Sequence, residues 1–173
     1  MKKTFLFLLV LACSFSSCEK DDICDASTIT TPRLVISFYD FNNPSELKSV
    51  TDLTIIGEGM TEGVTYSSST LVNGSTVSIP LKTDADATSY SFILNYGNSD
   101  ATVVNQDELK FNYSRQNIFV SRACGFKTEF TLDPTTAFVH TDAAVADAKW
   151  IEYIAVKESS ITNENETHLE IYF

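Results

Sequence analysis

The chain has 173 residues, of which 12 are basic and 23 acidic, and its formal net charge is −11 at pH 7. This excess of carboxylates argues against a nucleic-acid-binding protein, because such proteins gain affinity by neutralising phosphates with lysine and arginine. The length fits a single domain, and 43% of the residues are apolar, enough to bury a real core.

Residues 1–17 have the three parts of an export signal. Lys2 and Lys3 form the basic part, Phe5–Phe15 the apolar part, and Ser16–Ser17 the small residues before a cleavage site. The apolar run is about half of the ~20 residues that a membrane-spanning helix needs, so a transmembrane segment is the weaker alternative. The sequence therefore predicts a signal peptide over residues 1–17.

Cys18 directly follows these small residues, and this arrangement resembles the bacterial lipobox. In that class of signals the cysteine is acylated, and two or more acyl chains anchor a protein stably in a bilayer. Cys13 is the alternative acceptor, but it has a shorter apolar run before it. We expect lipid attachment at Cys18, followed by a lipidated tether over residues 18–31.

A charged run, Glu19, Lys20, Asp21 and Asp22, comes directly after Cys18. It resembles the surface-export signal of Bacteroidota lipoproteins, which places a lysine and two acidic residues close to the lipidated cysteine. The resemblance implies an outer-membrane lipoprotein facing the cell exterior. The alternative is a solvated tether on a lipoprotein that faces the periplasm. Cleavage before Cys18 would remove two basic residues and no acidic one, leaving a formal charge of −13.

Cys24 and Cys124 are the two cysteines that remain. Export leads to a compartment where disulfides form, so the economical interpretation is one bond between them, with two separate buried thiols as the alternative. Chain entropy makes a loop of about 100 residues worth ~4.7 kcal/mol. The bond would also hold the domain near the membrane, because the five residues between Cys18 and Cys24 reach at most ~18 Å.

Residues 32–173 are predicted to form a single all-β domain. Runs rich in β-branched and aromatic residues alternate with turn residues at the spacing of short strands. The expected strands are 33–39, 50–56, a short one near Tyr66, 76–81, 89–96, 109–114, 118–122, 126–132, 150–157 and 168–173. This pattern favours an immunoglobulin-like β-sandwich of about 7–9 antiparallel strands, with a small β-barrel as the alternative.

Three local signals refine this expectation. Asn73 and Gly74 predict a hairpin that leads into strand 76–81. Pro80 predicts that this strand lies at the edge of a sheet, since proline cannot donate a hydrogen bond. Thr141–Lys149 is the one helix candidate, with Thr141 as its N-cap.

Motifs for catalysis or metal binding are sparse. The two histidines, His140 and His168, stand far apart in the sequence, and no nucleophile elbow or distinct carboxylate pair accompanies them. Two distant cysteines and two histidines do not make a zinc site. We therefore expect no catalytic residue, no cofactor and no metal. A hydrolase built from carboxylates is the alternative.

Two weaker sequence patterns are compatible with ligand binding. Asp84 and Asp86 alternate in a loop, an arrangement that calcium can use, although a solvated turn explains it better. The chain has 20 aromatic residues, which could form a platform for sugar rings, but most stand at alternating strand positions typical of a core. Trp150 and Tyr153 have opposite parity, so one of them is expected to face outward.

Three segments are distinctive: Thr31–Leu34, the FVSxxCGF-like run Phe119–Phe126, and the closing strand Thr167–Phe173. With the lipobox, they resemble an uncharacterised family of Bacteroidota outer-membrane lipoproteins classed as a domain of unknown function. The resemblance extends over nearly all of the chain after Cys18. It implies location and architecture, and it supplies no activity, ligand or catalytic residue.

These observations favour a non-catalytic binding or structural module that acts on a protein or other material of the cell envelope. The alternatives are a glycan-binding accessory of nutrient uptake and a hydrolase. A coplanar pair of exposed aromatic residues would favour the glycan. A pocket that holds His140 or His168 beside a carboxylate would favour the enzyme. A surface with neither feature would favour the module.

Overall fold

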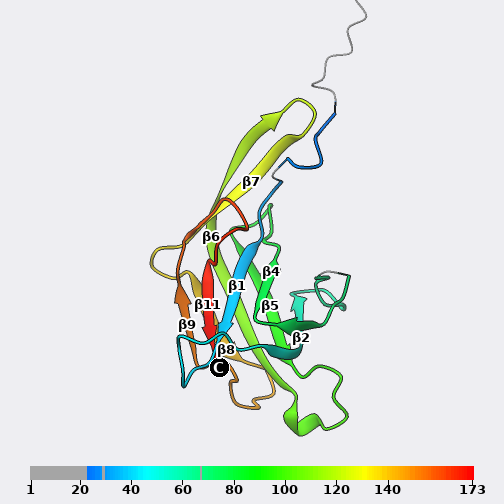
Figure 1. Cartoon of the computed structure of the whole chain (residues 1–173), viewed down its shortest axis with the longest axis vertical. Coiled ribbons are helices and arrows are strands. Elements are labelled where there is room, and N and C mark those ends of the chain that lie inside the picture. The colour runs from blue at the N-terminus through cyan, green and yellow to red at the C-terminus, as the bar shows by residue number, and fades with distance from the viewer. Residues whose placement is uncertain (1–22, 29, 67) are drawn as a thin grey trace, which may run out of the picture. The chain divides into compact units, whose positions relative to one another are not determined.

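The structure is a computed structural model that describes residues 23–28, 30–66 and 68–173. Strands dominate it, and no α-helix occurs in these residues. In chain order the elements are β1 (Leu34–Tyr39), β2 (Val50–Gly57), β3 (Val72–Gly74), β4 (Thr76–Ile79), β5 (Ala87–Leu94), the 3-10 turn η2 (Ala101–Val103), β6 (Asn105–Ser121), β7 (Gly125–Leu132), β8 (Phe138–Asp142), β9 (Tyr153–Val156), β10 (Ser160–Ile161) and β11 (Leu169–Tyr172) (Figure 1).

The strands form two sheets. One has four strands in the order β4-β1-β11-β9, which lie side by side in Figure 1. The other has seven, in the order β10-β7-β6-β5-β2-β3, with β8 also paired to β6. The two sheets do not close into a barrel, so the predicted all-β sandwich is confirmed. The structure has more strands than expected, and β1 pairs with β11 in parallel, so the antiparallel expectation is wrong for this pair.

Contacts divide the chain into two units. The first, which we call the hairpin unit, contains the described residues up to Thr28 together with Ile118–Lys127. The second, the sandwich unit, contains Ile29–Asn117 and Thr128–Phe173. The long strand β6 contributes residues to both units, and it replaces the two separate strands expected at 109–114 and 118–122.

The core of the sandwich unit follows from the period-two alternation of its strands. In β11, Leu169 and Ile171 are fully buried while Glu170 and Tyr172 are partly exposed. The same alternation buries one face of the neighbouring strands. The largest fully buried side chains are Phe38, Phe92, Phe111, Phe130, Leu34, Ile36, Leu53, Ile55, Ile79, Leu109, Leu132 and Ile151.

The hairpin predicted at Asn73 and Gly74 is wrong. β3 pairs with β2 in the seven-stranded sheet, whereas β4 pairs with β1 in the other sheet, so the chain crosses between sheets at this point. Neither residue has the positive φ that the tight hairpin turn requires. Instead, the Asn73 side chain forms two hydrogen bonds with Asp52, each of 2.9 Å. The edge position predicted from Pro80 is confirmed, because β4 ends the four-stranded sheet.

The helix predicted over Thr141–Lys149 is also wrong. Thr141 lies in β8, opposite Glu108 of β6, and the chain after β8 is irregular. A helix of under three turns is marginal without packing, and β6 offers this segment backbone hydrogen bonds instead. Ala148 has φ +66°, and its carbonyl accepts a 2.6 Å hydrogen bond from Asn105. This segment therefore follows the sheet rather than its own helix propensity.

Candidate functional site

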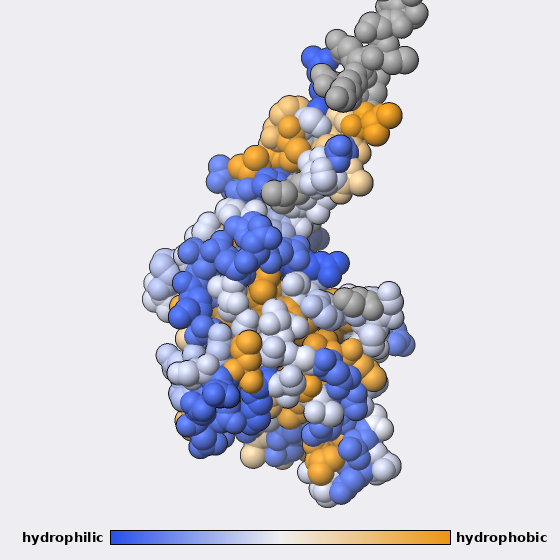
Figure 2. Space-filling view, in the orientation of Figure 1, coloured by the Kyte–Doolittle hydropathy of each residue, from blue (hydrophilic) through white to orange (hydrophobic). Residues whose placement is uncertain are grey.

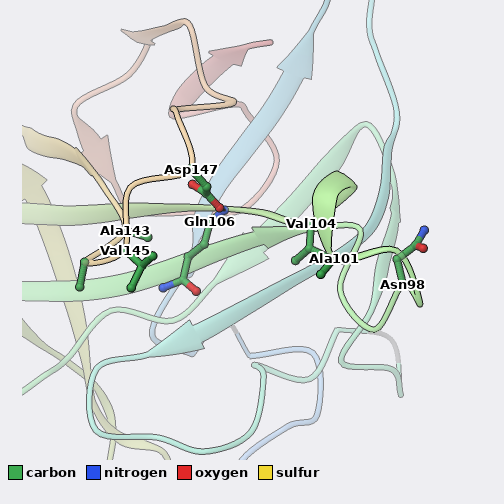
Figure 3. A pocket seen from close by; sticks show the side chains of 8 residues that line it. Asn98, Ala101, Val104, Gln106, Ala143, Val145 and Asp147 are labelled. Carbon is green, nitrogen blue, oxygen red and sulfur yellow. The ribbon is translucent and has the colours of Figure 1, made fainter.

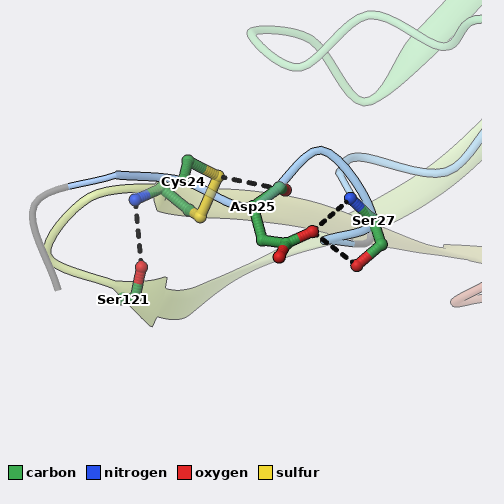
Figure 4. Close-up of a disulfide and its surroundings, with 5 residues drawn as sticks. Cys24, Asp25, Ser27 and Ser121 are labelled. Carbon is green, nitrogen blue, oxygen red and sulfur yellow. Dashed lines mark hydrogen bonds between the residues drawn. A yellow bond between two sulfur atoms is a disulfide. The ribbon is translucent and has the colours of Figure 1, made fainter. Parts of the chain in front are cut away.

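The Cys24–Cys124 disulfide is present, so the predicted bond is confirmed (Figure 4). It joins residues 100 positions apart, with their Cα atoms separated by 4.8 Å. Both cysteines belong to the hairpin unit. The first described residues of the chain are thereby covalently fastened to the turn between β6 and β7.

Local turns present the two cysteines to each other. The Cys124 N–H donates to the Ser121 Oγ at 3.0 Å, and the following Gly125 has φ +70°, a conformation that favours glycine. On the other segment, the Asp25 carboxylate accepts hydrogen bonds from the Ser27 hydroxyl at 2.6 Å and its N–H at 2.8 Å (Figure 4). These bonds lower the pKa of Asp25 below its ordinary value.

Large apolar side chains are exposed on the hairpin unit. Ile23 is 83% exposed, Phe119 58% and Phe126 69%. The two phenylalanine rings pack edge to face, with centroids 5.4 Å apart. Figure 2 shows hydrophobic residues at the surface of this unit. Phe126 has the same strand parity as the buried Phe130, yet its side chain is exposed; Phe126 belongs to the hairpin unit and Phe130 to the sandwich unit.

His140 lies beside a carboxylate, but not in an open site. Its Nε2 is 2.8 Å from Oδ2 of Asp107, which is fully buried and also accepts a 2.9 Å hydrogen bond from the Ile151 N–H. Burial raises the pKa of Asp107 above its ordinary value, although both hydrogen bonds oppose this effect. The His140 side chain is 14% exposed and stands opposite the buried Leu109 in the β6–β8 register. The pair therefore faces the core.

A cavity of about 520 Å³ lies nearby in the sandwich unit (Figure 3). Its lining residues come from the segment after β5, the start of β6 and the segment after β8: Asn98, Ala101, Val104, Gln106, Ala143, Ala144, Val145 and Asp147. Gln106 precedes Asp107 in β6, so their side chains point to opposite faces of the sheet. Neither His140 nor Asp107 lines this cavity. The arrangement that would favour an enzyme is not found here.

His168 has a structural role in the core of the sandwich unit. It is fully buried, and its Nδ1 accepts a 2.9 Å hydrogen bond from the Val35 N–H of β1. An unprotonated Nδ1 is needed to accept this bond. Burial is the main cause that lowers the pKa of His168, while the nearby Glu166, Glu158 and Glu164 act in the opposite direction. The neutral imidazole ring of His168 thus links β1 to the residue that precedes β11.

Acidification is expected to destabilise the fold through His168. Its pKa in the folded chain lies below the ordinary value of 6.5, so the unfolded chain takes up the proton first. The free energy of unfolding should therefore fall as the pH drops below about 6.5, by at most about 1.4 kcal/mol per pH unit for this one group. Denaturant unfolding at a series of pH values measures the effect. His168→Asn, which retains an acceptor, should show a smaller dependence, and an unchanged slope would contradict the assignment.

Three tyrosines form a row across the four-stranded sheet. Tyr172 of β11 is paired with Tyr39 of β1 and with Tyr153 of β9. The Tyr172 ring lies 5.4 Å from that of Tyr39 at 27°, and 5.7 Å from that of Tyr153 at 43°. A hydrogen bond to Glu170 is the main cause that raises the pKa of Tyr172 to about 12.

These rings pack against one another, as cross-strand aromatic pairs commonly do. Neither pair is coplanar, and the exposed Phe119 and Phe126 meet at 66°. The aromatic geometry that would favour a glycan platform is therefore not found in these pairs. The expectation that one of Trp150 and Tyr153 faces outward is confirmed, since Trp150 is buried and Tyr153 exposed.

The aspartates considered for calcium have other surroundings. The Asp86 carboxylate accepts a 2.7 Å hydrogen bond from the Arg115 side chain, which also donates to the Thr83 carbonyl. Arg115 thus forms hydrogen bonds with two oxygens of this loop. Among the described residues, no group of three or more histidine, cysteine, aspartate or glutamate side chains has the arrangement of a metal site. The Arg115 side chain therefore binds the loop that contains Asp84 and Asp86, through Asp86 and the Thr83 carbonyl.

The predicted lipid and export residues lie outside the described residues. These are Cys18, Glu19, Lys20, Asp21 and Asp22, and with them the signal peptide over residues 1–17. The boundaries given above for signal, tether and domain stay predictions. Within the described part of the chain, no helical segment has the length and hydrophobicity of a membrane span.

The two sheets and the bonded cysteines define an all-β sandwich protein whose N-terminal segment is covalently fastened to a hairpin. Residues 52–173 match a family of unknown function, DUF6452, and the chain belongs to this family. Resemblance to an uncharacterised family is thus confirmed, although the match does not reach Thr31–Leu34 or Cys24. No curated protein and no solved structure matches the chain.

Proposed function

We propose that this protein is a lipid-anchored, non-catalytic module of the bacterial outer membrane. Acyl chains on Cys18 hold it there, and the Cys24–Cys124 disulfide fastens the folded chain close to the anchor. The observation that carries the proposal is this bond, since Cys24 follows Cys18 by only six positions. A covalent clamp so near an anchor limits how far the hairpin unit can move from the membrane surface.

The enzyme and glycan alternatives receive less support. The His140–Asp107 pair faces the core, and the Asp107 oxygen bound to His140 also accepts the Ile151 N–H. A buried pair of this kind stabilises the pairing of β6 with β8, and this structural role is sufficient to explain it. The tyrosine row packs ring against ring. We therefore propose that the module acts through binding or structure, on a protein or other envelope material, with display on the cell exterior favoured by residues 19–22.

Lipid attachment is tested by paired cysteine variants. The wild-type chain is expected to incorporate radiolabelled palmitate and to give a mature N-terminus at Cys18 with the mass of added acyl chains. Cys18→Ala should lose both the label and the membrane fraction, because no other cysteine follows the small-residue site directly. Cys13→Ala is the matched control and should keep both.

The outcomes of this experiment separate the alternatives. An unmodified, water-soluble wild-type protein would overturn the proposal, and loss of label in Cys13→Ala alone would move the anchor to Cys13. Protease added to intact cells then decides the orientation. Digestion supports display on the outside, whereas protection until the outer membrane is opened places the protein on the periplasmic face.

A further inference from the structure

The hairpin unit exposes three large apolar side chains, Ile23, Phe119 and Phe126, which we call the apolar patch. All three side chains are more than half exposed. In a soluble domain large apolar residues gathered at one place usually mark a surface that is covered in use. Phe119 and Phe126 are held together across the hairpin, and Ile23 directly precedes the disulfide that closes the unit. The patch is thus part of a covalently braced structure.

Its place in the chain indicates what covers it. Ile23 follows Cys18 by five positions, and Phe119 and Phe126 flank the other cysteine of the disulfide. If Cys18 carries acyl chains, the five residues between Cys18 and Cys24 limit the distance between the hairpin unit and the bilayer to at most ~18 Å. This step depends on the proposed lipid anchor. The surface nearest to the patch is then the lipid itself.

The charge of the hairpin supports the same occupant. The chain as a whole carries a net charge of −11, yet Ile118–Lys127 contains Arg122 and Lys127 and no acidic residue. Arg122 is exposed. Basic side chains beside aromatic and aliphatic ones are typical of segments that lie in the interface between headgroups and acyl chains. The acidic residues near the patch in sequence are confined to the N-terminal segment, with Glu19, Asp21 and Asp22 before Ile23 and Asp25 after it.

We infer that the hairpin unit docks on the bilayer that holds the anchor, with Phe119, Phe126 and Ile23 buried at the boundary between headgroups and acyl chains. The acyl chains on Cys18 and the hairpin then form two contacts with one membrane. The disulfide keeps the two contacts close together, because it bonds Cys24, six positions after Cys18, to the hairpin that carries Phe119 and Phe126. Two contacts restrict the rotation of a lipoprotein that one flexible tether would leave free.

Depth-dependent quenching tests the inference. Acylated full-length protein is placed in vesicles of phosphatidylethanolamine and phosphatidylglycerol whose acyl chains carry bromine. Phe119→Trp and Phe126→Trp should each show a blue-shifted emission and a loss of the added fluorescence. Val145→Trp is the matched control, since Val145 is 85% exposed in the sandwich unit, and it should show neither change. The native Trp150 is buried and provides the background.

Each remaining outcome decides against the inference. Acylated variants quenched no more than Val145→Trp would overturn the docking and leave the lipid anchor intact. A preparation whose mass shows no acyl chains would overturn the proposed function itself and the docking with it. A blue shift that needs no vesicles and grows with protein concentration would assign the patch to contact between two copies of the chain.

Discussion

Replacing Cys24 with serine is expected to lower the free energy of unfolding by about 2–5 kcal/mol. The lost bond closes a loop of 100 residues, so its removal frees the unfolded chain much more than the folded one. Urea unfolding of the chain from residue 18 onward, with Cys18→Ser to prevent acylation, measures the change. The single tryptophan, Trp150, is buried and reports the loss of the core.

Matched variants check that the effect comes from the bond. Cys124→Ser and the double variant should be destabilised as much as Cys24→Ser, because all three remove the same covalent link. Reductant should lower the stability of the parent chain to that level and leave the variants unchanged. Two reactive thiols in the non-reduced parent, or equal stability of parent and variant, would contradict the prediction.

Replacing Asp107 with alanine is expected to destabilise the sandwich by about 2–5 kcal/mol. The substitution removes the acceptor of both the His140 Nε2 and the Ile151 N–H in a buried place. Asp107→Asn keeps an oxygen acceptor and the side-chain volume, so it should lose less than half as much. Chemical denaturation of the two variants beside the parent chain measures the difference.

The pH dependence of these variants adds a second readout. Burial raises the pKa of Asp107 in the folded chain above its unfolded value. Its contribution to stability is therefore greatest at low pH and is lost as the pH rises through the folded pKa. Asp107→Asn should not show this loss. An alanine variant as stable as the parent would mean that the pair contributes nothing to the fold, and His140 would then need another explanation.

Local patterns were sufficient wherever a strand buries one face. The strands at 87–94, 125–132 and 169–172 lie close to their predicted ranges, because alternation of apolar and polar residues follows directly from the geometry of a half-buried strand. The strands at 34–39 and 50–57 are buried at consecutive positions, and their runs of β-branched and aromatic residues predicted them. The segments that the prediction missed have a different character. β8 and β10 are short or only partly buried, and they exist because β6 and β7 offer unpaired edges.

Two local signals pointed to the wrong structure. Asn73 and Gly74 are typical of a hairpin, but their flanking strands belong to different sheets. Thr141 is a good helix N-cap, yet it pairs with Glu108 in a sheet. In both cases pairing with distant strands outweighed a preference of the local chain, which is worth only a few tenths to about 1 kcal/mol.

Residue types and their spacing along the chain predicted the all-β class and the cysteine pair, and they supplied the candidate lipid signal. Folding, in contrast, set which aromatic residues are exposed, since Phe126 has the same strand parity as the buried Phe130. It also brought Asp107 to His140, 33 positions apart, and set β1 beside β11 in parallel. These relations depend on how the sheets pack, and no local pattern contains that information.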